Sequence, residues 1–279
     1  MAPPSNDKFP KPIPLEVSVY GTVNGIQASK YGAKRLLLNH KGSQPDGGLT
    51  PTVQELRGLK GNVFIPINCT IRPRAAPKPG FGEQQDYIYS NQEITQMADA
   101  ILELKQAGVM NPLRGDSFVF GCLRRNDSRS VQDRNNIVIN RSQCHHLIEV
   151  AKPFGCTFNR AFDYFFETGD TGDWKDALRQ LSILGFKGVM TGGGPGYFNT
   201  HVDRLISMPD HLHEMQLVIA GGVSCPAIKY LRQETHNVNV HCIWLNAECL
   251  RPEDHNDPET SDVNGVMGLV DKLGLDAED

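Results

Sequence analysis

The sequence lacks any uninterrupted run of about 18 apolar residues, the length that marks a transmembrane helix, so we expect no membrane span. It also lacks an excess of positive charge, because 28 lysine and arginine residues stand against 32 aspartate and glutamate residues, which gives a net charge of −4 at pH 7. A general binder of nucleic acid or of a membrane surface needs a basic face, so we exclude both classes of partner. The first residues show neither a basic start nor an apolar segment, and we therefore expect no secretory signal.

Cysteine is present but lacks the patterns of a disulfide framework or a zinc module. The chain has seven cysteines, an odd number at irregular spacing, and no Cys-x-x-Cys pair occurs. We therefore expect reduced thiols in a cytoplasmic protein, and cysteine spacing predicts no metal site. A hydrophobic content of 39% with 22% charged residues is ordinary for a globular protein, and 279 residues suit one large domain.

Short apolar or β-branched runs alternate with amphipathic stretches from Leu15 onward, which is the pattern of βα units on a parallel sheet. This rhythm predicts a single-domain α/β fold, a (β/α)8 TIM barrel over residues 15–274, with an open doubly wound sheet as the alternative. Prolines near the start predict an irregular tail over residues 1–14, and the acidic residues 275–279 predict a frayed end. The predicted strands are Leu15–Tyr20, Arg35–Asn39, Val63–Ile71, Ser117–Leu123, Cys156–Arg160, Gly188–Thr191, Leu217–Ala220 and Val238–Leu245. The predicted helices include Thr50–Leu59, Asn91–Gln106, Arg141–Ala151, Asp173–Leu184 and Ser224–Gln233.

The first predicted strand alternates between apolar and polar side chains, which places Glu16 inside the barrel. A buried carboxylate is costly unless it is paired or hydrogen-bonded. Two interpretations stay open for Glu16. It forms a structural ion pair with an arginine of the barrel, or it serves as a general acid or base, or orients one.

Two arginines follow the third predicted strand, and the active sites of such barrels lie where strands end. Arg72 shares a face with Asn68, and this polar stripe indicates the lumen and the mouth of the barrel. The guanidinium groups of Arg72 and Arg74 suit a carboxylate or phosphate held by two parallel hydrogen bonds. For Arg72 the alternative is a salt bridge to Glu16 or Asp163, which is compatible with holding an anion.

The fifth predicted strand ends with three polar residues that packing alone does not explain, Asn159, Arg160 and Asp163. We predict that Arg160 and Asn159 contact an anionic ligand and that Asp163 orients an arginine or takes part in proton transfer. The eighth predicted strand carries His241 on the same face as Ile243, so His241 is expected to point inward and to titrate near neutral pH. A buried histidine with satisfied hydrogen bonds is the alternative.

Three glycine-bearing loops follow the second, sixth and seventh predicted strands. The first opens a helix, whose free backbone N–H groups can hold an anion, and the other two lie where barrels of this type often bind phosphate. Tight turns between strands and helices need glycine in any case, so both interpretations stay open. The candidate ligand-binding residues in these loops are Gly48, Thr50, Thr191, Gly192, Gly221 and Gly222.

Five segments occur in an order that is typical of one known family. They are Leu15-Glu16-Val17, Gly47-Gly48-Leu49-Thr50-Pro51, Ile71-Arg72-Pro73-Arg74, Asp86-Tyr87-Ile88-Tyr89-Ser90 and Thr157-Phe158-Asn159-Arg160-Ala161-Phe162-Asp163. Through these segments the chain resembles the CutC copper-homeostasis family over residues 15–245. The resemblance implies a (β/α)8 barrel, a link to copper tolerance and copper(I) binding, and a homo-oligomer, with no settled enzymatic reaction.

The chain also departs from the family pattern. The family's proposed copper ligands are two cysteines, and their positions align with Ser18 and Asn39 here. Copper(I) is soft and prefers sulfur to a hydroxyl or an amide, so we expect weak copper binding or none at this place. An acidic residue and a histidine usual in the family are Leu37 and Asn159 here, and neither side chain can act as an acid or base at these positions.

Three hypotheses of function follow. The first is a copper-homeostasis protein that binds copper(I), as the resemblance implies. The second is a TIM-barrel enzyme, or the remnant of one, that acts on a small anionic or phosphorylated metabolite held by Arg72 and Arg160, with Glu16 or His241 as the proton carrier and Asp163 orienting an arginine. The third is a non-catalytic scaffold or sensor of small molecules.

Overall fold

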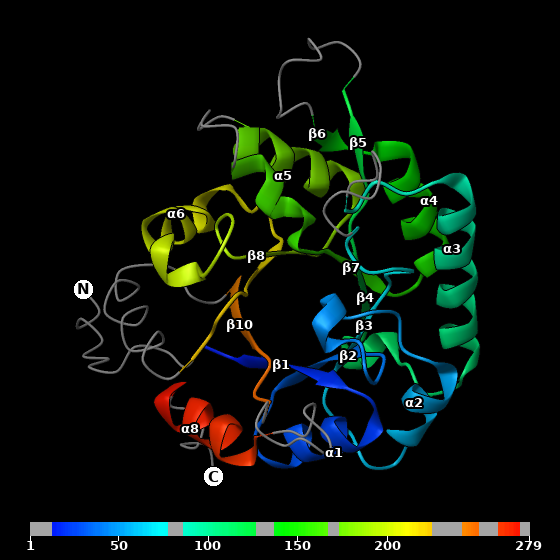
Figure 1. Cartoon of the computed structure of the whole chain (residues 1–279), viewed down its shortest axis with the longest axis vertical. Helices are drawn as coiled ribbons and strands as arrows, with labels where there is room; N and C mark the ends of the chain where they lie inside the picture. Colours follow the sequence, from blue (N-terminus) through cyan, green and yellow to red (C-terminus); the bar gives the residue numbers. More distant parts are fainter. Residues whose placement is uncertain are drawn as a thin grey trace, which may run out of the picture.

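The computed structural model of the protein describes residues 13–77, 86–126, 137–166, 173–224, 242–250 and 262–273. Within these ranges eight parallel strands close into a barrel, seen in Figure 1 as the ring at the centre of the molecule. The eight are β1 (Leu15–Tyr20), β2 (Arg35–Asn39), β3 (Ile67–Thr70), β4 (Ser117–Phe120), β7 (Gly155–Phe158), β8 (Gly188–Thr191), β9 (Gln216–Ile219) and β10 (Ile243–Ala247). They pair in the order β1-β10-β9-β8-β7-β4-β3-β2, with β2 beside β1, so the predicted (β/α)8 barrel is confirmed.

Helices surround the barrel on the outside (Figure 1). They are α1 (Thr22–Lys30), α2 (Val53–Gly58), α3 (Asn91–Gln106), α4 (Arg141–Ala151), α5 (Asp173–Leu184), α6 (Val202–Ser207) and α8 (Val263–Leu273). The bounds predicted for α3, α4 and α5 are confirmed, whereas α1, α6 and α8 were not predicted. Within the described ranges, every helix is too short or too polar to span a lipid bilayer.

Some boundaries differ from the predicted ones, each for a local reason. Helix α2 begins three residues after Thr50, because Thr52 is its N-cap and forms a capping box with Glu55. The predicted strand Ser117–Leu123 is two elements, since β4 ends at Phe120 and a hairpin follows. In that hairpin β5 (Leu123–Arg125) pairs antiparallel with β6 (Ile137–Ile139). Of the predicted helix Ser224–Gln233, residues 225–233 lie outside the described residues.

The predicted N-terminal tail is two residues too long. Ile13 is buried in the outer core, and the carbonyl of Pro14 accepts a hydrogen bond of 3.0 Å from the backbone N–H of Leu245 on β10. Residues 13 and 14 therefore belong to the barrel. The rest of the predicted tail, 1–12, and the acidic end, 275–279, lie outside the described residues.

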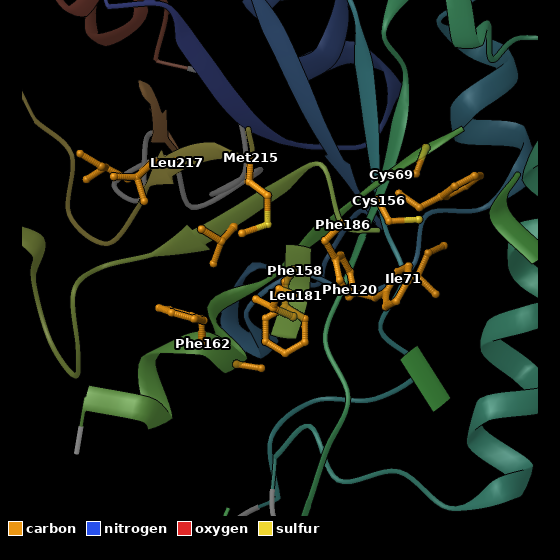
Figure 2. Close-up of a cluster of buried hydrophobic side chains, with 14 of the residues drawn as sticks. Cys69, Ile71, Phe120, Cys156, Phe158, Phe162, Leu181, Phe186, Met215 and Leu217 are labelled. Carbon is orange, nitrogen blue, oxygen red and sulfur yellow. The ribbon is translucent and has the colours of Figure 1, made fainter. Parts of the chain in front are cut away.

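Apolar side chains form two separate layers. A small cluster fills the middle of the lumen, where Leu37, Val119, Met190 and Val218 meet. A larger cluster packs between the strands and the helices, and Figure 2 shows part of it, with Cys69 among the side chains. Cys69 thus points away from the lumen, as its strand position predicts, and it packs as a small hydrophobe. The polar side chains of the lumen lie above and below the small apolar cluster.

Candidate functional site

Glu16 is fully buried in the lumen, where three side chains donate to its carboxylate. Arg35 Nε donates to Glu16 Oε2 at 2.5 Å, and Asn68 Nδ2 donates to the same oxygen at 2.8 Å. Asn246 Nδ2 donates to Oε1 at 2.8 Å. Arg35 also stacks on Trp244, with 3.8 Å between Cζ and the ring centroid. Since Arg35 opens β2, this group lies toward the amino ends of the strands, and Glu16 has the barrel arginine that the ion-pair interpretation requires.

Arg72 pairs with Asp86, and not with Glu16 or Asp163, the partners considered from the sequence. Its Nη2 lies 3.0 Å from Asp86 Oδ2, and Nη1 donates to the Asp46 carbonyl at 2.5 Å. Its Nε is buried and has no hydrogen-bond partner among the described residues. Most of the guanidinium therefore binds neighbouring segments of the chain and stabilises the wall of the mouth.

Thr50 and Arg74 also fasten segments of the chain at this rim. Thr50 Oγ1 donates to the Arg72 carbonyl at 3.0 Å and accepts from the Arg72 backbone N–H at 2.8 Å. Arg74 Nε donates to Glu93 Oε1 at 2.5 Å, and Nη2 donates to the carbonyl of Ile88 at 2.8 Å. Glu93 belongs to the capping box at the start of α3, so Arg74 ties the end of β3 to that helix.

Arg160, Asp163, Thr191 and Gly192 form one connected group at the carboxyl ends of β7 and β8. Arg160 Nε donates to Asp163 Oδ2 at 2.8 Å, which is the orienting contact predicted for Asp163. The other oxygen, Oδ1, accepts from Thr191 Oγ1 at 2.5 Å and from the Gly192 backbone N–H at 3.0 Å. Burial raises the pKa of the Asp163 carboxyl, and these hydrogen bonds offset only part of that effect. Arg160 Nη2 also makes a long hydrogen bond of 3.4 Å to the carbonyl of Gly196, and the Arg160 side chain stays 37% exposed at the mouth.

The glycine loops after β8 and β9 lie against Arg160. A Cβ atom on Gly192 would lie 3.3 Å from Arg160 Nη2, and one on Gly221 would lie 3.4 Å from Nη1. Gly221 also has a φ of 95°, which favours glycine. Gly222, with a φ of 80°, is covered by the ring of Tyr197, 2.2 Å from the place of a Cβ. Because these glycines have no side chains, the two loops place main-chain atoms directly beside the Arg160 guanidinium.

Asn159 and His241 are the remaining candidates from the strands. Asn159 is buried, and its Oδ1 accepts from the backbone N–H of Ala161 at 3.1 Å, so this amide stabilises the turn that follows β7. His241 lies outside the described residues. Ile243, which the sequence placed on the same face as His241, packs outward in the larger core, whereas Trp244 borders the lumen cluster.

Asp86 and Tyr87 join this mouth, although the sequence did not single them out as site residues. Asp86 binds Arg72, and the ring of Tyr87 lies under the same guanidinium, 5.4 Å from Cζ to the centroid. Tyr87 also meets the ring of Tyr164 edge-on, with 6.2 Å between centroids. In the sequence, Asp86 and Tyr87 stood out only as part of Asp86–Ser90, one of the segments that carry the resemblance to the CutC family. Their contacts could not be predicted, because they depend on how the connection after β3 folds back over the barrel.

Comparison with known proteins agrees with this architecture. A sequence model described as "CutC family" matches residues 13–244. The chain belongs to the CutC family. Among its CutC relatives, the copper homeostasis protein cutC homolog of Drosophila melanogaster is 30% identical over 263 residues, covering 93% of this chain and 87% of the fly protein. The homolog of Caenorhabditis elegans is 31% identical over 240 residues, covering 85% of this chain and 80% of the worm protein. The crystal structure of a putative copper homeostasis protein CutC from Streptococcus agalactiae shares the fold, with a TM-score of 0.66 at 19% identity over 85% of this chain and 99% of that one.

The copper positions suggested by the CutC resemblance hold oxygen and nitrogen donors that are already engaged. Ser18 Oγ donates to Asn246 Oδ1 at 3.0 Å, and Asn39 Oδ1 accepts from Thr70 Oγ1 at 2.6 Å. Gly48 lies directly against Asn39, since a Cβ on Gly48 would be 2.3 Å from Asn39 Oδ1. Copper(I) prefers sulfur, so this donor set does not fit the ion. Across the described ranges, no three His, Cys, Asp or Glu side chains gather in a way that would hold a metal ion.

Proposed function

We propose that this CutC-family barrel binds a small anionic metabolite, one with a phosphate or carboxylate group, and that Arg160 holds the anionic group. The observation that carries the proposal is the position of the Arg160 side chain and its contacts. Its Nε is fixed by Asp163 at 2.8 Å, while the terminal nitrogens lie beside Gly192 and Gly221 in a side chain that is 37% exposed. The hydrogen bond from Nη2 to the Gly196 carbonyl is long, at 3.4 Å, so an anion that offers two oxygens can replace it and accept from the outer edge of the guanidinium.

The surroundings of Arg160 support the same proposal. It lies at the carboxyl ends of the strands, the face on which barrels of this class carry their ligand sites. Among the described residues, no acceptor pairs with the backbone N–H of Gly221 or Gly222, so these groups are available to an anion as well. The net charge of −4 does not favour anion binding in general, so a specific local cation is required.

The proposal narrows the set of arginines considered from the sequence. Arg72 binds Asp86 and the Asp46 carbonyl, and Arg74 binds Glu93 and the Ile88 carbonyl, so both have intramolecular acceptors. Arg160 is also paired, with Asp163, but its side chain is 37% exposed, against 6% for Arg72 and 22% for Arg74, so it is the most accessible of the three to a ligand. We therefore propose that Arg72 and Arg74 shape the mouth and that Arg160 recognises the ligand.

Copper(I) binding, the first hypothesis, is supported by the names of the relatives and not by the geometry of the suggested ligand positions. We propose that copper(I) does not bind at Ser18 and Asn39 with the affinity that a pair of thiolates would give. Any role of this chain in copper homeostasis then does not require copper at these two residues.

Calorimetric titration with inorganic phosphate tests the proposal. We expect Arg160→Gln to lower the affinity for phosphate by at least tenfold, because a hydrogen bond to a charged group contributes about 1.5–3 kcal/mol. The matched control is Arg179→Gln, which removes the same charge from an exposed arginine paired with Asp176 on α5. Equal affinities in the two variants, or no binding of phosphate by the wild type at millimolar concentration, would overturn the proposal.

A further inference from the structure

Tyr87 has a main-chain conformation that tyrosine rarely adopts. Its φ is 62°, in the left-handed region, where a bulky side chain costs roughly 1–2 kcal/mol. Two hydrogen bonds hold it there: its N–H donates to Asp86 Oδ1 at 3.0 Å, and its carbonyl accepts from the Leu123 N–H at 2.8 Å. Strained residues that the surroundings fix in this way cluster at ligand sites, so this outlier motivates a functional hypothesis.

The ring of Tyr87 is fixed as firmly as its backbone. The Arg72 guanidinium lies over it at 5.4 Å, and Tyr164, which directly follows Asp163, meets it edge-on at 6.2 Å. Both contacts are favourable for an aromatic ring. The ring therefore lies between Arg72, which is paired with Asp86, and Tyr164, which follows Asp163 in the chain.

The hydroxyl of Tyr87 lies within electrostatic reach of both ion pairs of the mouth, Arg72 with Asp86 and Arg160 with Asp163. Burial raises its pKa well above the ordinary tyrosine value, with Asp86 adding to the effect and the arginines opposing it, so the group stays protonated at neutral pH. Among the described residues, none accepts a hydrogen bond from this hydroxyl. It is thus a neutral donor on a ring that Arg72 and Tyr164 hold in the same mouth as Arg160.

We infer that Tyr87 is a specificity-determining residue of the mouth, whose hydroxyl donates a hydrogen bond to an uncharged oxygen of a ligand that places its anionic group on Arg160. The inference rests on the proposed function and deepens it. The ligand class becomes a phosphorylated or carboxylated molecule that also carries a hydroxyl or carbonyl oxygen. A simple inorganic anion would satisfy Arg160 and leave Tyr87 without a partner.

Two phosphate monoesters separate the two contacts. Methyl phosphate offers only the anionic group, whereas glycerol 3-phosphate adds two hydroxyl groups. We expect the wild type to bind glycerol 3-phosphate roughly three- to tenfold more tightly than methyl phosphate, the range that one net hydrogen bond supplies. In Tyr87→Phe that ratio should fall to about one while the affinity for methyl phosphate stays within about twofold.

The ratio is insensitive to a loss of folded protein, because both affinities are measured on the same sample. Tyr31→Phe is the control, since it removes a hydroxyl at the end of α1 that belongs to no part of the mouth. A wild type that binds both esters equally, or a Tyr87→Phe variant that keeps the preference, would overturn the inference. Neither result would affect the proposal that Arg160 binds the anionic group. A wild type that binds neither ester would overturn both the proposed function and this inference.

Discussion

Arg35 and Glu16 form a buried ion pair inside the barrel, with 2.5 Å between Nε and Oε2 and both side chains almost wholly excluded from solvent. The pair lies between neighbouring strands, because Glu16 on β1 and Arg35 on β2 are register partners. Asn68 donates to Oε2 of the same carboxylate, and Asn246 donates to Oε1. A carboxylate held in this way stabilises the lumen and is poorly placed to exchange protons with a ligand at the mouth.

Removing one partner of this pair should be strongly destabilising. We expect Glu16→Gln to lower the free energy of unfolding by about 3–5 kcal/mol, since it leaves the charge of Arg35 buried without a counterion. The double variant Glu16→Gln with Arg35→Met should lose less than the sum of the two single variants, because it removes both charges together. Urea unfolding of the four proteins measures this coupling. Additive losses, or a Glu16→Gln protein as stable as the wild type, would contradict the assignment.

On β1 and β3 the side chains that face the lumen followed from the sequence, because alternation along a strand is a local property. Alternation placed Glu16 inward and Cys69 outward correctly, but it failed at Ile243 on β10. The partner of Glu16 could not be predicted, since it depends on the register between β1 and β2. Asp86 was missed for a related reason. It lies in a connection, and no local pattern tells where a connection meets the end of β3.

Helix α1 shows why other elements escaped prediction. Gly25 stands in the middle of it and Gly21 at its N-cap, where no side chain caps the helix, so the sequence carries no helix signal. The structure supplies the reason for Gly25, because a Cβ there would lie 2.8 Å from Leu59 Cδ2. Close packing of α1 against Leu59 therefore accounts for the glycine, and that contact is tertiary.

Copper(I) should bind weakly to the wild type and more tightly once sulfur is supplied. Burial raises the pKa of the Cys156 thiol to about 12 and that of Cys69 further, so these thiols do not readily give the thiolates that copper(I) requires. The variant Ser18→Cys with Asn39→Cys places two thiols on the lumen faces of neighbouring strands. We expect it to retain copper(I) against a chelator that strips the wild type. Stoichiometric binding by the wild type that survives the same chelator would refute this expectation.

The pH dependence of stability should reveal the buried carboxyl of Asp163. Its pKa is raised in the folded protein, chiefly by burial, so the folded state binds the proton more tightly than the unfolded chain does. Stability attributable to Asp163 is therefore lost as the pH rises from the ordinary aspartate pKa through the raised one. Asn does not titrate, so Asp163→Asn should gain stability relative to the wild type between pH 4 and pH 7.

Asp176→Asn provides a control of opposite sign on the same barrel. The pKa of Asp176 is lowered, first by its hydrogen bond with Arg179 and then by that with Gln180, so its contribution to stability appears as the pH rises. Relative to the wild type, Asp176→Asn should therefore lose stability mainly as the pH rises from about 2 to about 4, the range below the ordinary aspartate pKa, while Asp163→Asn gains stability as the pH rises above that value. Denaturant unfolding at pH 2, pH 4 and pH 7 measures the two differences. If they change in the same direction, the carboxyl of Asp163 is not held in the environment that orients Arg160.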